Sequence, residues 1–349
     1  MKLCLIAPAS LLYMPYLSNY TEILDGKIDY DVINWDRFGD EEDSALTYCD
    51  GKRGARRNFY DYIKFTKFAF KHLINNKYDM VIIFSLQLCF FMQMHLFNND
   101  IKYIIDIRDF HPLVKYITPS IFEKSEIVVI SSPGFRSFLP KKVNSLINHN
   151  TRISSIEQIS ARVVSLKEYP LSIVNIGAAR DADINRRLLL DLKNDKNFEI
   201  FYHGTGGCEA ILQQFASDHG VGNVFFSGKY SRSEELELYK QSNFINVLRK
   251  NDSLNNYYAL PNRLYYAPML GVPLLGFEGT VLSSIIEKYG LGLIMDNHQT
   301  FKSQIISYIS SYSQDVFDRN RRIFLRLAID ENEKFRNMVF EILQSFDAS

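Results

Sequence analysis

Short apolar runs alternate with longer amphipathic stretches along most of this chain. The expected strands are residues 2–7, 30–35, 80–84, 102–107, 126–130 and 144–147 in the first half, and 171–176, 199–202, 224–227, 244–248, 273–276 and 291–295 in the second. Stretches of helical length, such as residues 59–75 and 209–219, separate most of them. Strands that alternate with helices in this way predict parallel sheets covered on both faces.

The pattern starts afresh after residues 151–168, which lack a strong strand signal and form a candidate linker. A chain of 349 residues is long enough for two domains of ordinary size. We therefore predict an α/β protein with two Rossmann-like, doubly wound parallel-sheet domains, 1–165 and 166–315, and a helix at 316–349 that packs back toward the first domain. In such sheets ligands bind beyond the carboxyl ends of the strands, where the strand order reverses. Two such domains facing each other form a cleft, and we expect the chemistry there.

A polar stretch, residues 36–57, interrupts the first half. It carries consecutive acidic residues at 40–43 and then basic residues at 52, 53, 56 and 57. This composition predicts a long mobile loop.

The charge balance and the cysteines limit the possible partners. Forty basic and forty acidic residues cancel, so no overall field attracts nucleic acid, and we expect none as a partner. Four cysteines lie far apart with no CxxC pair, and the histidines show no ligand spacing, so we expect no metal and no cofactor. The N-terminal apolar run is too short for a signal peptide, and polar residues interrupt the run at 80–97, which favours a strand and a buried helix over a membrane span. We expect a soluble, cytoplasmic protein.

Residues 257–280 combine a helix, a strand and a loop that opens a second helix. The helix is expected to start near Pro261 and to end at Gly271, because proline suits a first turn and glycine suits a C-cap. Gly279 and Thr280 then begin the next helix, whose free N–H groups and dipole favour an anion. An ordinary αβα repeat is the alternative.

Polar residues follow the expected strand at 102–107. Asp109 and His111 are candidates to move a proton or to hold a substrate hydroxyl, with Arg108 beside them. The alternative is a turn held by a salt bridge between Asp106 and Arg108.

Three further strand ends carry candidate binding residues. His203, Gly204 and Gly206 form a glycine loop after a strand, which permits close approach of a ligand, and Gly177 begins a similar turn. Arg249 and Lys250 follow the strand at 244–248, where they would face the helix start at Gly279 and Thr280 and would suit a diphosphate. Tight turns and a solvated pair of cations are the alternatives.

Residues 53–72 interleave aromatic and basic side chains. Such a stretch is typical either of a segment that lies on an anionic membrane surface or of a surface helix whose aromatic face packs in the core. The chain has no P-loop, no GxGxxG after the first strand and no GxSxG, which argues against a kinase, a nicotinamide dehydrogenase and an α/β-hydrolase.

Taken together, several motifs resemble the GT-B glycosyltransferases, and among them the bacterial family 4 enzymes of surface polysaccharide synthesis. The motifs are residues 201–206, 224–228 with 234–239, and 260–273 in the second half, and 106–109 and 131–140 in the first. Their order and spacing carry the resemblance over most of the chain.

The resemblance implies a glycosyltransferase, of hexosyltransferase type, that uses a nucleotide-diphosphate sugar, most simply a UDP-sugar, and retains anomeric configuration without a metal. The nucleotide would bind the second domain, near Asn262, Arg263 and Tyr266, with Arg249 and Lys250 stabilising the leaving diphosphate. A saccharide acceptor, most simply lipid-linked at the inner face of the membrane, would lie in the first domain near Ser10, Arg108 and Asp109, in capsule, O-antigen or exopolysaccharide synthesis. Closure of the domains over the donor is expected.

The sequence departs from this family in two places. The loop after the first strand, residues 7–10, lacks the glycines often found there. Two glutamates of the family's donor helix are replaced by Tyr258 and Tyr266. A hydroxyl can contact a ribose but cannot accept two hydrogen bonds as a carboxylate can. A non-catalytic partner subunit and a non-hydrolysing sugar-nucleotide epimerase therefore stay open as alternatives.

Overall fold

The chain forms two compact units. The computed structural model describes residues 1–42, 44–54, 56–99, 101–231 and 233–347. Unit 1 comprises Met1–Arg152 and Asp330–Ser349, and unit 2 comprises Ile153–Ile329. Residues 153–165, which the sequence division assigned to the first domain, lie in unit 2.

Unit 1 is built on a seven-stranded sheet in the order β3-β2-β1-β4-β5-β6-β7. The strands are β1 (Lys2–Ala7), β2 (Asp29–Asp36), β3 (Thr47–Cys49), β4 (Met80–Phe84), β5 (Lys102–Ile107), β6 (Ile127–Ile130) and β7 (Ser145–Ile147). In the described part of unit 1, four α-helices lie between these strands: α1 (Ser18–Leu24), α2 (Phe59–Asn76), α3 (Leu86–Asn98) and α4 (Pro119–Glu123). All paired strands are parallel. The strand order reverses between β1 and β4, so a ligand of this unit is expected beyond their carboxyl ends.

The stretch 36–57 differs from the predicted loop. β3 lies within it and pairs with β2. The Asp36 carboxylate accepts N–H groups from three following residues, 38–40, and the buried guanidinium of Arg57 binds both carboxylate oxygens of Asp50. These bonds tie the segment to the sheet; residues 43 and 55 lie outside the described part of the chain.

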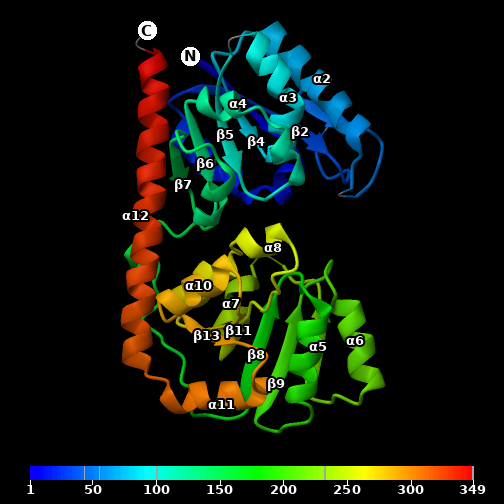
Figure 1. Ribbon diagram of the computed structural model, residues 1–349, viewed down its shortest axis with the longest axis vertical. Coiled ribbons are helices and arrows are strands. Elements are labelled where there is room, and N and C mark those ends of the chain that lie inside the picture. The colour runs from blue at the N-terminus through cyan, green and yellow to red at the C-terminus, as the bar shows by residue number, and fades with distance from the viewer. Residues whose placement is uncertain (43, 55, 100, 232, 348–349) are drawn as a thin grey trace. The chain divides into compact units, whose positions relative to one another are not determined.

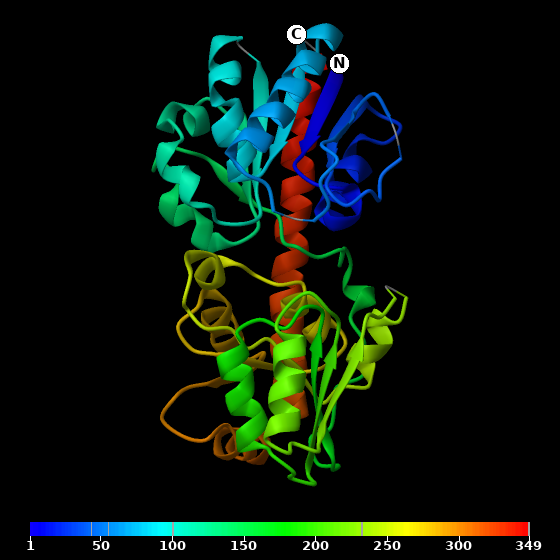
Figure 2. The same cartoon turned by 90° about the vertical axis from the view of Figure 1, so that its right-hand side faces the viewer.

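Unit 2 is built on a six-stranded parallel sheet in the order β10-β9-β8-β11-β12-β13. Its elements are β8 (Leu171–Ile176), α5 (Ala182–Asp191), β9 (Phe198–His203), α6 (Glu209–Asp218), β10 (Val224–Gly228), α7 (Glu235–Lys240), β11 (Phe244–Asn246), α8 (Leu254–Tyr258), α9 (Arg263–Met269), β12 (Leu274–Phe277), α10 (Val281–Lys288), β13 (Gly292–Met295) and α11 (Phe301–Ser311). Figure 2 shows α5 and α6 side by side against this sheet. The order reverses between β8 and β11.

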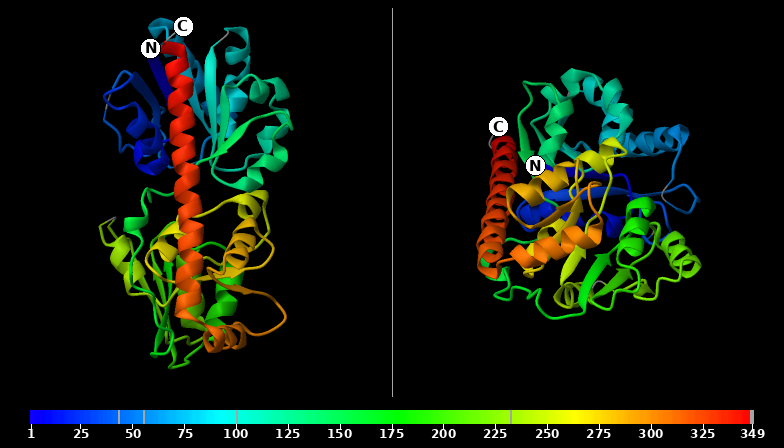
Figure 3. Two further views of the ribbon diagram at one scale, coloured as in Figure 1. Left: turned by 90° about the vertical axis from the view of Figure 1, so that its left-hand side faces the viewer. Right: turned by 60° about the horizontal axis from the view of Figure 1, so that its bottom comes forward.

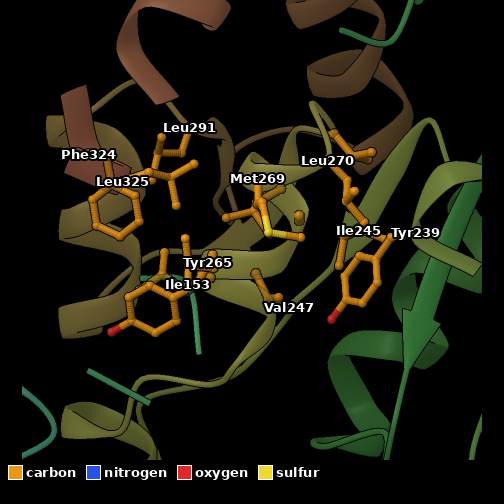
Figure 4. Close-up of a cluster of buried hydrophobic side chains, with 14 of the residues drawn as sticks. Ile153, Tyr239, Ile245, Val247, Tyr265, Met269, Leu270, Leu291, Phe324 and Leu325 are labelled. Atoms are coloured by element: carbon orange, nitrogen blue, oxygen red, sulfur yellow. The ribbon is translucent and has the colours of Figure 1, made fainter. Parts of the chain in front are cut away.

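The last helix, α12 (Gln314–Asp347), contributes to the core of each unit in turn. In unit 2, Phe324 stacks on Tyr265 with ring centroids 5.8 Å apart, inside the cluster shown in Figure 4. In unit 1, where the red end of the chain lies beside the sheet (Figure 3), Phe335 and Val339 are fully buried. None of the described helices is long and apolar enough to cross a membrane.

The candidate linker at 151–168 packs into unit 2 from Ile153 onward. The N–H of Ser160 donates to the Met269 carbonyl and that of Val164 to the Gly271 carbonyl. Gly271 has φ +76°, and a Cβ there would lie 2.0 Å from the carbonyl oxygen of Arg162. The glycine expected as a C-cap is therefore also what lets this segment approach α9.

Candidate functional site

The predicted residues of the second half meet at the carboxyl edge of the unit 2 sheet. The Gly177 N–H after β8 donates to the His203 carbonyl at the end of β9, and the Lys250 N–H after β11 donates to Asp181 in the loop after β8. Gly279, after β12, has φ +85° and faces Asn251, whose Cβ would lie 3.7 Å from a Cβ added to the glycine. Loops from four neighbouring strands therefore enclose the point where the strand order reverses.

Arg249 and Lys250 are both partly buried at this edge. The Arg249 guanidinium donates to the Ala259 carbonyl at 3.3 Å. The Lys250 ammonium lies 3.5 Å from the Asp183 carboxylate, whose side chain is 73% exposed. A bond to an exposed carboxylate is weak, so Lys250 can turn to a stronger anion at little cost.

Asp181 is a candidate that the sequence reasoning missed. Its backbone is left-handed, at φ +55° and ψ +79°, which is unfavourable for a residue with a side chain. Its carboxylate accepts the Lys250 N–H at 3.1 Å and the Asn256 amide at 3.3 Å. Burial raises the pKa of Asp181 above its usual range, and nearby Asp252 adds to that effect. A strained, partly buried carboxylate beside two cations is typical of a functional site.

Arg263 bridges the two strands at the reversal. Its guanidinium donates to the Asn175 side chain on β8 at 2.7 Å and to the Asn246 carbonyl on β11 at 2.9 Å. Burial lowers the pKa of Arg263, but an arginine stays charged near neutral pH. The partners that these two bonds supply are neutral, and the Glu235 carboxylate acts on the charge without one of these bonds, so the guanidinium can still attract a bound anion.

The glycine loop of Gly204 and Gly206 lies beside a hollow of about 440 Å³. Gly204 has φ +130°, and a Cβ would lie 2.7 Å from the Gly177 carbonyl oxygen, so only glycine fits there. However, the buried Glu209 carboxylate, in the first turn of α6, accepts the N–H groups of Ala179 and Gly207. The chain's own carboxylate thus occupies the N-terminal end of α6, where a bound anion would otherwise interact with the helix dipole.

His203 does not share that hollow. It lines a second one, of about 320 Å³, with Phe201, Glu199 and Leu238 on the other side of β9. Its Nδ1 lies 2.7 Å from the Ser227 hydroxyl, and burial lowers its pKa, which favours the neutral ring. The sequence grouped His203 with Gly204 because they are adjacent, but alternate strand residues point to opposite faces.

Thr280 caps α10 as expected. Its hydroxyl accepts the Ser283 N–H at 3.0 Å while the Ser283 hydroxyl accepts the Thr280 N–H at 2.9 Å. This capping box leaves the first-turn amides of residues 281 and 282 as the ones that an anion would meet.

The helix α9, which the resemblance assigned to donor binding, begins after Asn262, two residues later than expected, and Asn262 makes no side-chain cap. Tyr266 is partly buried beside Tyr239, with ring centroids 6.3 Å apart, and Tyr258 ends α8 against Tyr257. The two tyrosines at the glutamate positions thus come from two different helices.

In unit 1, Arg108 is part of a buried network. It binds both oxygens of Asp106, and Asp106 also accepts the Tyr20 hydroxyl at 2.6 Å. The same guanidinium reaches the Asn148 side chain and carbonyl. Burial alone would lower the pKa of Arg108, but the Asp106 carboxylate outweighs it and raises the pKa. This geometry fits the structural alternative, a salt-bridged turn.

The other unit 1 candidates differ in exposure. Asp109 is exposed, whereas the His111 Nδ1 accepts the Leu113 N–H at 3.2 Å and burial lowers its pKa. A neutral His111 in this bond carries its proton on Nε2 and therefore acts as a donor. Ser10 follows β1 at the reversal of this sheet, and its fully buried hydroxyl has no partner among the described residues.

Comparison with known proteins supports the fold. No protein-family model matches the chain, and no curated protein matches its sequence. Sucrose-phosphate synthase from Thermosynechococcus elongatus is similar over 100% of both chains, at 12% identity and TM-score 0.69. The apo lipopolysaccharide outer core galactosyltransferase WaaB covers 98% of this chain and 99% of its own, at 13% identity and TM-score 0.65.

Two further likenesses bear on the ligand. Anabaena HepE, solved with UDP-glucose, covers 98% of this chain and 99% of its own, at 10% identity and TM-score 0.63. UDP-N-acetylglucosamine 2-epimerase from Rickettsia bellii covers 100% of this chain and 97% of its own, at 12% identity and TM-score 0.62. At these identities the likeness is one of fold, and it confirms the predicted pair of Rossmann-like α/β units, the GT-B fold.

Proposed function

We propose that the protein is a glycosyltransferase that moves a sugar from a nucleotide-diphosphate sugar, of the UDP class, to a saccharide acceptor. The observation that carries the proposal is the group of cations Arg249, Lys250 and Arg263 at the strand reversal of unit 2. Phosphate oxygens are the ligands that such guanidinium and ammonium groups prefer. HepE, of the same fold, was solved with UDP-glucose, which supports the choice of nucleotide.

In the proposed reaction the bond between the anomeric carbon and the diphosphate breaks, and the acceptor oxygen forms the new bond. The diphosphate leaves with one more negative charge, which Arg249, Lys250 and the α10 amides stabilise. The acceptor hydroxyl gives up its proton, and Asp109 is the candidate carboxylate for it, while the Nε2–H of His111 holds an acceptor oxygen. From the resemblance we further propose retention, independence of metal, and a lipid-linked acceptor in bacterial surface polysaccharide synthesis; the likeness to WaaB fits that pathway.

A thermal-shift screen with UDP, GDP, ADP, CMP and dTDP tests the nucleotide site. UDP should raise the melting temperature, because a ligand that binds the native state stabilises it. Arg249→Ala should weaken UDP binding roughly tenfold to a hundredfold, the worth of one charge-assisted hydrogen bond. Lys193→Ala, at an exposed lysine of the same unit, is the matched control and should bind UDP normally.

The alternatives give different results. A shift with none of the five nucleotides would favour a non-catalytic partner. The likeness to the epimerase favours a second function, and incubation with UDP-N-acetylglucosamine alone separates the two, because an epimerase converts this sugar without an acceptor.

A further inference from the structure

The outer side of α2, α3 and a 3₁₀ turn, η3 (Pro112–Tyr116), exposes large apolar side chains. Six of them exceed half of their full exposure: Phe59 54%, Tyr60 74%, Ile74 56%, Met94 66%, Phe97 52% and Tyr116 60%. We call these residues the α2–α3 face. Figure 1 shows the two helices side by side on unit 1. Apolar patches of this extent on a folded surface mark interaction sites.

The exposed charge on this face is basic. Lys64, Lys67 and Lys71 lie between Tyr60 and Ile74 at spacings of three and four, so these five side chains form one stripe along α2. The only carboxylate of that helix, Asp61, is buried and bound by Lys52.

The neighbouring elements continue this pattern. α3 carries no Asp, Glu, Lys or Arg in its 13 residues. The Lys115 ammonium lies 4.9 Å from the Tyr116 ring centre, and that of Lys124 lies 4.3 Å from the ring centre of Phe97. Five lysines therefore lie around the apolar side chains, and in the described part of α2, α3, α4 and η3 the exposed acidic residue is Glu123.

Phe59 packs on the Phe90 and Phe91 rings of α3, and Tyr116 lies near Phe90, whereas Tyr60, Met94 and Phe97 make no ring contact between α2 and α3 in the described part of the chain. The inner side of α2 buries Phe65, Ala69 and Leu73, which anchors the helix. Two further ring pairs join the helices: Tyr62 stacks on Phe91 at 5.1 Å, and Phe70 stacks on His95 at 3.9 Å. Tyr60, Met94 and Phe97 can therefore be changed while the helix pair is kept.

We propose that the α2–α3 face binds the surface of an anionic lipid bilayer. Aromatic and aliphatic side chains enter the headgroup region, and lysines at their edge pair with negative headgroups. The site differs from the one expected at residues 53–72. Arg57 forms an ion pair with Asp50 inside unit 1 and is therefore not on the face. In addition, α3 and η3 supply half of the exposed apolar residues. The inner side of α2 fits the alternative of a surface helix that packs in the core, and the outer side is the part that the membrane proposal concerns.

Co-sedimentation of the full chain with vesicles tests the proposal. Vesicles of phosphatidylcholine with 30% phosphatidylglycerol (roughly the charge of a bacterial inner leaflet) should bind the protein, and pure phosphatidylcholine should not. Lys64→Glu/Lys67→Glu/Lys71→Glu should lower the partition coefficient between vesicles and solution at least about a hundredfold, because each lysine lost lowers it about fivefold and the three factors multiply. Lys193→Glu/Lys196→Glu/Lys288→Glu changes the net charge equally on unit 2 and should bind as the wild type does.

A second variant tests the apolar part. Tyr60→Ser/Met94→Ser/Phe97→Ser alters only exposed side chains, so circular dichroism and melting temperature should be unchanged while binding falls. Equal binding by the two lysine variants, or no binding of the wild type at low salt, would overturn the proposal. So would a wild-type dimer in light scattering that the serine variant turns into a monomer, because the face would then cover a second copy of the chain.

Discussion

Asp181 offers the sharpest test of the reasoning about the nucleotide site. A residue with a Cβ at φ +55° costs about 1–2 kcal/mol relative to the right-handed conformation, whereas glycine bears no such cost. We therefore expect Asp181→Ala to be less stable than Asp181→Gly by about 1 kcal/mol. Urea unfolding of the two variants measures this difference, and both lose the same hydrogen bonds to Lys250 and Asn256, so these cancel in the comparison.

Asp181→Asn isolates the charge, because asparagine tolerates the left-handed conformation and keeps an oxygen for the Lys250 N–H. The folded-state pKa of Asp181 is raised above its ordinary value of 3.8, so at neutral pH the ionised carboxylate opposes folding. We expect Asp181→Asn to be more stable than the wild type by a few tenths of a kcal/mol at pH 7.5, since the group is only partly buried. The gain should shrink as the pH falls through the folded-state pKa and vanish below about 3.8.

The same Asn variant should lose function while gaining stability. An amide oxygen is a weaker acceptor than a carboxylate, so asparagine holds the Lys250 N–H and the Asn256 amide less firmly, the loop at 249–256 can move more, and UDP affinity and sugar transfer should fall about tenfold. Equal stability of the Ala and Gly variants would refute the strain. Unchanged UDP binding and turnover in Asp181→Asn would refute the role of the carboxylate.

Two further predictions concern the two units separately. Gly271→Ala should destabilise unit 2 by more than about 2 kcal/mol in urea unfolding, because the added Cβ meets the Arg162 carbonyl oxygen. The control Gly26→Ala, at φ +70° but in open space, should cost only about 1 kcal/mol. Equal costs would contradict the close approach at Gly271. Arg108→Ala should cost about 3–5 kcal/mol in the same measurement, because it leaves the buried Asp106 carboxylate unpaired, whereas exposed Asp109→Ala should cost less than about 0.5 kcal/mol.

The sequence predicted the sheets because buried parallel strands are continuous apolar runs. Met80–Phe84 is buried at every position, and its bounds were predicted correctly. β3 was missed because Thr47–Cys49 is a three-residue edge strand with a polar start, which has no such pattern. Strand ends were predicted less exactly, since β11 ends at Asn246 and not at 248, but Gly177 and the Arg249–Lys250 pair still follow neighbouring strands at one edge of the sheet.

What the sequence could not supply is the partner of each polar group. The Arg108 network depends on Tyr20 and Asn148, which are far away along the chain, so the ion pair and the catalytic turn were equally compatible with the pattern. Asp181 was overlooked because a positive φ at a residue other than glycine leaves no signal in the sequence. From the sequence, Glu209 was only the first residue of an expected helix. The structure shows that its carboxylate accepts the N–H of Ala179 in the loop after β8.

The helix N-termini at the carboxyl edge of unit 2 differ in their own charge, and this difference bears on where the proposed diphosphate would bind. α5 has Asp183 in its first turn and follows Asp181, and α6 has Glu209, so both already hold carboxylates. α10 has no acidic residue in its first turn and is capped by neutral Thr280. α8, α9 and α11 also lack an acidic first turn, but α10 is the helix that follows Gly279, which faces Asn251 in the loop of Arg249 and Lys250. We therefore expect its dipole to act together with these two cations on an anion.

Thr280→Asp tests this conclusion. Aspartate is as good an N-cap as threonine, so α10 should keep its capping bond to the Ser283 N–H, and its burial should cost no more than about 1–2 kcal/mol. Its charge would repel the diphosphate, and UDP should no longer raise the melting temperature. Thr280→Asn adds the same volume without charge and should keep most of the shift, and Thr300→Asp, at the N-cap of α11, should keep all of it. A full UDP shift in Thr280→Asp would place the diphosphate elsewhere on the sheet edge and would end the case for α10.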